Sequence, residues 1–136
     1  MKPSAPFRLL AIYLQIAYTT RMAVAKVPRL APAALDEIRS AFGLSYAELA
    51  ALFHVSRPAV QQWRLNGVPP ERAADVDRIR ELAAVFALRF IPARVPQIVR
   101  TPGRGLGERS VLDVLATSGV EPVYAYLERL FSYTPG

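Results

Sequence analysis

Residues 46–70, YAELAALFHVSRPAVQQWRLNGVPP, contain two short apolar segments separated by a turn. Two short helices that cross at a steep angle need apolar side chains at fixed positions, and little more than a methyl group fits where they come closest. Ala50 occupies that position. The other apolar positions are Leu49 and Phe53 in the first helix, Val55 in the turn, and Val60 and Trp63 in the second helix. This spacing predicts a helix-turn-helix.

The residues between these apolar positions mark the ends of the second helix. Ser56 can cap its start, and Pro58 falls in its first turn, where a missing backbone N–H costs no helical hydrogen bond. Asn66 and Gly67 are expected to end it. His54 stands in the turn, at a position where the backbone is often left-handed, and His tolerates that conformation better than most residues. We expect His54 to be a turn residue without a metal-binding or catalytic role.

The polar face of the second helix predicts DNA binding. Gln can pair with adenine and Arg with guanine through two hydrogen bonds, and each such pair contributes about 1–3 kcal/mol of discrimination. The side chains expected to reach base edges are Arg57, Gln61 and Gln62, and those expected to contact phosphates are Ser56, Arg64 and Arg72. The alternative is a solvated helix face on a protein–protein interaction module.

Capping signals divide the rest of the chain into further helices, so the fold class is predicted to be all-α. Apolar residues at helical spacing precede a stop at Gly43: Leu35, Ile38 and Phe42. Ser45 and Glu48 form a capping-box pair, which makes Glu48 a structural residue. A long helix is expected from Pro70 to about residue 90, and Pro96 opens a short one.

The C-terminal part contains two more predicted helices. Ser110 and Asp113 cap the segment VLDVLATS, and the last helix is expected to begin at Pro122. The glycines at 103, 105 and 107 do not form G-x-G-x-x-G and follow no strand, so a nucleotide cradle is not expected. We therefore divide the chain into an N-terminal arm (1–30), a helix-turn-helix domain with a long bridging helix (31–91) and a C-terminal module (92–136).

Composition excludes several classes of site. The chain has 136 residues, no Cys and one His, which removes disulfides, thiolate metal sites and clusters of several histidines, and fits a reducing cytoplasm. The formal net charge of +6 is compatible with an anionic partner, although GC-rich coding would also enrich Arg. Asp75 and Asp77 point apart on a helix and have no nucleophile–base partner, so we expect neither an enzyme nor a bound metal or cofactor.

The N-terminal arm allows several interpretations. Its apolar run is interrupted at Gln15 and at residues 19–21, which makes it shorter than the ~18 apolar residues of a membrane-spanning helix. It could be a signal peptide that ends at residues 23–25, or Met22 could be the true start. The other interpretation is a strand or helix that packs against the body or mediates dimerisation. No membrane association is expected.

The sequence V-S-R-P-A-V-x-x-W followed by N-G-V-P-P resembles the Xre-like helix-turn-helix family, and this likeness covers residues 33–90. Residues 95–131 are similar to the toxin-binding domain of MbcA/ParS/Xre antitoxins. They keep Thr101–Pro102, Leu106–Gly107 and Gly119 of that pattern, but have Gly103 where Asn is usual and Val111 where Pro is usual.

The resemblance implies a type II antitoxin that forms a dimer or higher oligomer and neutralises a RES-domain toxin, which consumes NAD+. It also implies repression of the protein's own operon through operator DNA. The antitoxin's C-terminal end would cover the toxin's active site, and the expected contacts are Leu127, Arg129, Leu130, Phe131 and Tyr133. Alternatively, the apolar residues of this set belong to the core and residues 132–136 form a frayed tail.

Two other functions remain open on sequence grounds. The chain could be a stand-alone phage-type or cellular repressor whose C-terminal module only dimerises, and it would then bind paired half-sites without a toxin partner. It could also be an interaction protein that keeps the helix-turn-helix as a scaffold. Substitution of Gln61 and Gln62 would leave the function of such a protein intact.

Overall fold

The computed structural model describes residues 31–132, and this part of the chain is helical, as predicted. Gly103 and Arg109 form an isolated antiparallel bridge. The helices are α2 (Ala33–Phe42), α3 (Tyr46–Leu52), α4 (Arg57–Asn66), α5 (Pro70–Arg89), α6 (Val95–Arg100), α7 (Val111–Ser118) and α8 (Glu121–Ser132), with 3₁₀ turns η1 (Pro92–Arg94) and η2 (Arg104–Leu106).

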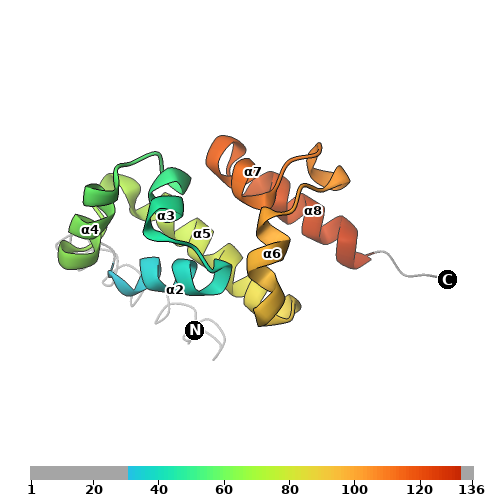
Figure 1. The fold of residues 1–136 in the computed structure, drawn as a ribbon, viewed down its shortest axis with the longest axis horizontal. Coiled ribbons are helices and arrows are strands. Elements are labelled where there is room, and N and C mark those ends of the chain that lie inside the picture. The colour runs from blue at the N-terminus through green and yellow to red at the C-terminus, as the bar shows by residue number, and fades with distance from the viewer. Residues whose placement is uncertain (1–30, 133–136) are drawn as a thin grey trace, which may run out of the picture.

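The long helix α5 connects two groups of helices. Figure 1 shows α2, α3 and α4 at the end where α5 begins, and α6 beside the end where it finishes. α2 lies along α5, and the Phe42 and Phe86 rings meet edge to face at 5.5 Å. Val95, Val99 and Val123 of the C-terminal helices are fully buried in the same apolar cluster. Residues 31–91 and 92–132 therefore share one hydrophobic core.

The local start and stop signals act as the sequence predicts. Gly43 ends α2 with φ of 65°, in the left-handed region that favours glycine. Ser45 and Glu48 form a complete capping box at the start of α3, and Ser110 with Asp113 forms another at the start of α7. The last helix begins at Glu121, one residue before the predicted start, because Pro is tolerated within the first turn.

Arg100 joins the end of α6 to the capping box of α3. Its Nη2 donates to Oε1 of Glu48 at 2.8 Å and its Nε donates to Oε2 at 3.1 Å. The same guanidinium donates to the carbonyl oxygens of Gly43 at 2.7 Å and of Phe42 at 3.2 Å. These carbonyls lie at the C-terminal end of α2, where helical partners run out, so one cation stabilises the ends of two helices.

This contact makes the stability of the fold depend on pH. The hydrogen bonds from Arg100, and then from the Ser45 backbone N–H, lower the pKa of Glu48 below its usual 4.5. A carboxylate with a lowered folded-state pKa stabilises the fold above its unfolded-state pKa, and this contribution is lost as pH falls through the folded-state pKa. We therefore expect the wild-type chain to be more stable than Glu48→Gln at about pH 7, and the difference to shrink towards about pH 3.

Urea unfolding midpoints at both pH values measure the effect. Glu128→Gln, at an exposed position of α8, is the matched control and is expected to leave the pH profile unchanged. A constant difference between the wild type and Glu48→Gln from neutral to acidic pH would contradict this account of the Arg100–Glu48 contact.

Candidate functional site

The first candidate surface is built on the pair α3 and α4. Ala50 is 3% exposed where the helices meet, Val60 is fully buried and Trp63 is 6% exposed. The rings of Phe53 and Trp63 pack edge to face at 6.1 Å across the pair. The Val55 N–H donates to the Ala50 carbonyl at 3.0 Å, which closes the turn between the helices. The apolar positions chosen from the sequence are therefore the ones that hold this pair together.

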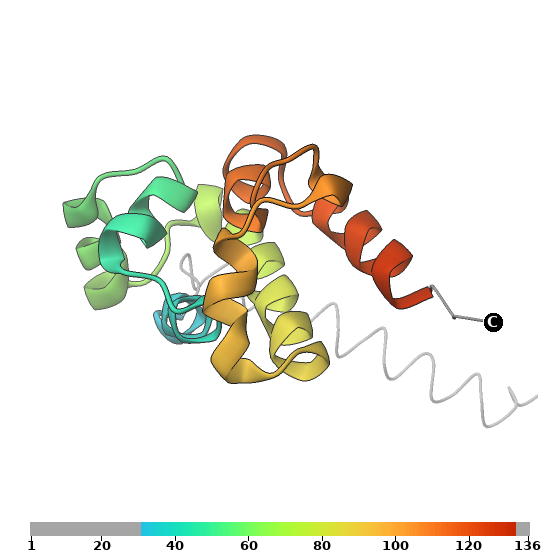
Figure 2. The same cartoon turned by 45° about the vertical axis from the view of Figure 1, so that its right-hand side comes forward.

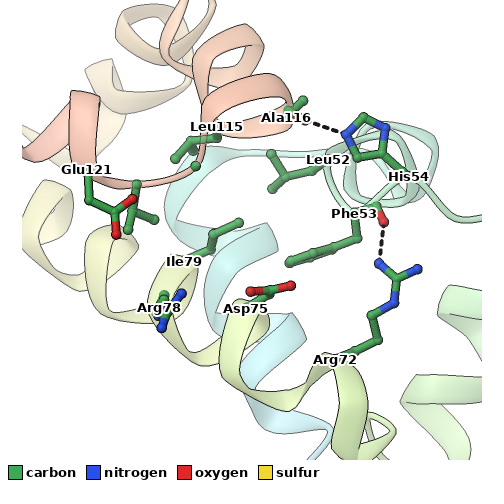
Figure 3. Close-up of a pocket in the computed structure, with 12 residues that line it drawn as sticks. Leu52, Phe53, His54, Arg72, Asp75, Arg78, Ile79, Leu115, Ala116 and Glu121 are labelled. Carbon is green, nitrogen blue, oxygen red and sulfur yellow. Dashed lines mark hydrogen bonds between the residues drawn. The ribbon is translucent and has the colours of Figure 1, made fainter.

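His54 lies in the turn with φ of 56°, which is uncommon for a residue with a side chain. The left-handed backbone expected at this position is present. His54 also has a second role: its Nε2 hydrogen-bonds to the carbonyl oxygen of Ala116 in α7. The sequence did not reveal this contact, since the two residues are 62 positions apart. Figure 3 shows this bond at the rim of a hollow of about 220 Å³ between the α3–α4 turn, α5 and α7. His54 therefore links the α3–α4 pair to the C-terminal helices.

The left-handed backbone gives a testable difference between two substitutions of His54. Asn adopts this conformation more readily than other residues with a side chain, whereas a β-branched residue is a strong outlier there. Both substitutions alter the contact with Ala116. We therefore expect His54→Val to destabilise the fold by about 1–2 kcal/mol more than His54→Asn. Urea unfolding measures the difference, and equal losses for the two variants would show that the backbone at His54 is unstrained.

The exposed face of α4 carries the predicted base-reading residues. Arg57 and Gln62 are exposed, and Gln61 is half-buried. Within the helix, Gln62 accepts a hydrogen bond from Asn66 at 3.0 Å, and Gln61 accepts one from Arg64 at 3.2 Å. These bonds hold the amide groups in defined orientations. Sequence reasoning missed Leu65, which is 76% exposed one turn further along this helix and presents an apolar surface.

The three predicted phosphate contacts all have partners inside the protein. The Ser56 oxygen accepts from the Ala59 N–H at 3.2 Å, which is the expected helix cap and leaves its own O–H free to donate. Arg72 donates to the Phe53 carbonyl at 3.0 Å (Figure 3) and so ties α5 to the turn. Ser56 is exposed and Arg72 is half-buried.

Arg64 points towards α2 and α3. Its guanidinium lies 4.6 Å from the centre of the Tyr46 ring, and its Nε lies 3.7 Å from a carboxylate oxygen of Asp36. That separation makes an ion pair but not a hydrogen bond, and the Nε is buried without a hydrogen-bond partner. The side chain is two-thirds buried. Arg64 is therefore held by the protein more firmly than Arg57.

The positive charge of the chain is concentrated outside this surface. Five of the 17 Lys and Arg residues lie in residues 1–30, which contain no Asp or Glu. The remaining 106 residues carry 12 arginines against all 11 acidic residues and are nearly neutral. Residues 1–30 therefore account for most of the net charge of +6. On the face of α4, Arg57 supplies a local positive charge.

The second candidate surface is the C-terminal end of α8. Leu130 is 46% exposed and Phe131 is 38% exposed. The Phe131 ring lies 5.4 Å from the Phe90 ring, and the Arg89 guanidinium stacks on its face at 4.2 Å. Leu127 is only 4% exposed and belongs to the core. Tyr133 lies outside the described residues. Figure 2 shows this end of α8 projecting from the side of the molecule where α5 and α6 meet.

The glycine-containing loop supports α8 from one side. A Cβ at Gly105 would lie 2.6 Å from the Tyr126 ring, so only glycine fits there without a shift of the ring. Arg129 donates to the Gly105 carbonyl at 3.1 Å. The Gly103 N–H bonds to the Arg109 carbonyl at 3.1 Å and closes the loop. The glycines thus allow a close approach of the loop to α8.

Residues 31–132 contain no recognisable metal centre or membrane-spanning helix. This part of the chain has no group of three His, Cys, Asp or Glu side chains that could hold a metal ion. None of its helices is both long and apolar enough to cross a membrane. Asp75 lines the hollow below His54 together with Arg78 and Glu121, on the surface of α5 and at the start of α8.

The chain is similar to a curated antitoxin. The probable mycobacterial cidal antitoxin of Mycobacterium tuberculosis is 30% identical over 87 residues, which make up 64% of this chain and 76% of that protein. No protein-family model matches the chain, and no solved structure matches it.

Proposed function

The chain belongs to the family of the mycobacterial cidal antitoxin from Mycobacterium tuberculosis, and on that basis we propose that it is a type II antitoxin that binds and neutralises a cognate toxin protein. The observation that carries this proposal is the identity over 76% of the relative's length. The chain also offers a surface for such a partner, because the end of α8 leaves two large apolar side chains partly exposed. Exposed apolar clusters of this kind are typical of protein-binding sites.

The toxin-binding surface in this proposal is the C-terminal end of α8. Leu130 and Phe131 supply its apolar centre, Arg129 supplies a cation at its edge, and Tyr133 follows directly in the chain. Leu127 belongs to the core of the described structure, and we propose that it positions the helix for this contact. This arrangement corresponds to the hot-spot pattern in which aromatic and Arg side chains provide most of the binding energy.

The toxin is proposed to be of the RES-domain type, and the support is the resemblance of residues 95–131 to MbcA/ParS/Xre antitoxins. The motif residues of that likeness have structural roles in this chain. Leu106 is buried beneath the loop, and Gly107 has φ of 65° at the end of η2. Two of the residues shared with MbcA/ParS/Xre antitoxins, Leu106 and Gly107, therefore shape the loop before α7.

The α3–α4 pair is proposed to be a helix-turn-helix that binds operator DNA and represses the protein's own operon. Arg57 and Gln62 would read base edges from the exposed face of α4, with Gln61 between them. Ser56 stands at the N-terminus of α4, where a phosphate would be stabilised by the helix dipole. Arg72 would contact a phosphate from the start of α5, whereas Arg64 would support the helix and reach the DNA only at its edge.

Complex formation with the product of the neighbouring gene tests the antitoxin proposal. The two proteins are co-expressed and separated by size-exclusion chromatography, and a co-eluting complex is the expected result. If the chain elutes alone and binds operator DNA, a stand-alone repressor is the better description. A sharp dependence of DNA affinity on salt concentration would accompany that outcome.

A further inference from the structure

A long hollow on the outer side of α2 has no occupant among the described residues. It measures about 580 Å³ and is bounded by α2, by Ala87 of α5 and by Pro92 and Val95 of the following turn and helix. The residues that α2 contributes lie at positions i, i+3, i+4, i+7 and i+8: Ala33, Asp36, Glu37, Ser40 and Ala41. That spacing is one continuous stripe along the whole helix. The hollow is therefore a groove that runs the length of α2.

The walls of this groove suit a closely packed segment of chain. Ala33, Ala41 and Ala87 carry only methyl groups, so another backbone can approach closely. The neighbouring residues Leu88 and Ile91 are 85% and 61% exposed. Large apolar side chains so exposed at the end of a long helix add surface that an apolar segment could cover.

Residues 1–30 have the composition that such a groove would accept. Residues 9–18, LLAIYLQIAY, are apolar except for Gln15. Residues 1–30 also contain five cations and no acidic residue: Lys2, Arg8, Arg21, Lys26 and Arg29. The groove presents the carboxylates of Asp36 and Glu37, whose side chains are 61% and 58% exposed. Each has one arginine partner at the long distance of 3.7 Å, so a further cation can still pair with it.

The connection between this segment and the groove is short. Ala31 lies two residues before Ala33, which lines the groove. A connector of five residues, 26–30, spans at most roughly 17 Å, and α2, with its 10 residues, is about 15 Å long. The segment before the connector can therefore double back along α2 of its own chain.

We propose that residues 7–25 pack into the groove between α2 and the end of α5 of the same chain, with their apolar side chains against the alanine-lined wall and their cations beside Asp36 and Glu37. This cover would complete the core on the outer side of α2. The inference rests on the groove and the sequence, and is independent of the proposed antitoxin function.

The absence of cysteine from the chain permits a direct test with the full-length protein. Ser40→Cys places a near-isosteric thiol in the groove, and Ala47→Cys places one on the exposed side of α3 as the matched control. We expect a thiol reagent to react with the Cys at position 40 about tenfold more slowly than with the Cys at position 47, because the segment must open to admit it. Leu10→Asp with Leu14→Asp, which makes docking unfavourable, should raise the rate at position 40 alone.

Two results would overturn the proposal. Equal rates at the two positions in the full chain, unaffected by Leu10→Asp and Leu14→Asp, would mean that the groove is open. Protection at position 40 that disappears on dilution would mean that the cover comes from a second copy of the chain. Helical circular dichroism of each variant confirms that a change in rate does not come from unfolding of α2.

Discussion

Replacement of both Leu130 and Phe131 by aspartate is expected to abolish toxin neutralisation while the chain remains folded. These side chains are the large apolar groups exposed at the end of α8, and a toxin that covers them would bury them. Loss of a hot-spot side chain from an interface costs about 2–4 kcal/mol, or roughly 30- to 1000-fold in affinity, and a carboxylate in its place adds a desolvation penalty. The growth of cells that express the toxin reports the loss.

The matched control is another exposed leucine on a different surface. Leu65 is 76% exposed on α4, and Leu65→Asp introduces the same charge away from α8. We expect Leu65→Asp to leave toxin neutralisation intact. If Leu65→Asp were as damaging as the double variant, or if the double variant still neutralised the toxin at equal protein levels, the toxin-binding surface would lie elsewhere.

Replacement of Arg57 and Gln62 by alanine is expected to weaken operator binding by roughly 30-fold or more, because each side chain that pairs with a base contributes about 1–3 kcal/mol. Both side chains are exposed on α4 and neither belongs to the buried core. Their loss should therefore leave thermal stability and toxin binding unchanged. Titration of a fluorescent operator fragment at fixed salt concentration measures the effect, with an unrelated fragment of equal length as reference.

Arg94→Ala with Gln97→Ala is the matched control for this variant. Both residues are exposed, and they are again one Arg and one Gln. They lie on η1 and α6, which follow the C-terminal end of α5, whereas α4 precedes its N-terminal end. The control should bind the operator like the wild type. Equal losses in the two double variants would indicate a general effect of charge, and DNA reading by α4 would have to be abandoned.

Local signals in the sequence were sufficient to predict the helices and their ends. Gly43 ends α2 because a left-handed residue is needed there, and Ser45 with Glu48 starts α3 because a capping box satisfies free N–H groups. The close contact at Ala50 follows from its spacing to Val60 and Trp63. Interactions between residues close in sequence can be predicted, because the geometry of a single helix or turn determines which of them meet.

Contacts between distant segments could not be predicted in this way. Arg100 reaches Glu48 across 52 positions and His54 reaches Ala116 across 62, and neither pair follows any periodicity. The burial of Leu127, which is 4% exposed and belongs to the hydrophobic core, could not be predicted from helical spacing either. The orientation of a helix relative to its neighbours depends on the packing of the whole chain.

Growth rescue is the most direct test of the antitoxin account. The product of the neighbouring gene is expressed from an inducible promoter, with the full-length chain or its Leu130→Asp and Phe131→Asp variant supplied from a second plasmid. The account predicts that the wild-type chain restores growth and that the variant, at the same protein level, does not. Failure of the wild-type chain to restore growth against a toxic neighbour would contradict it.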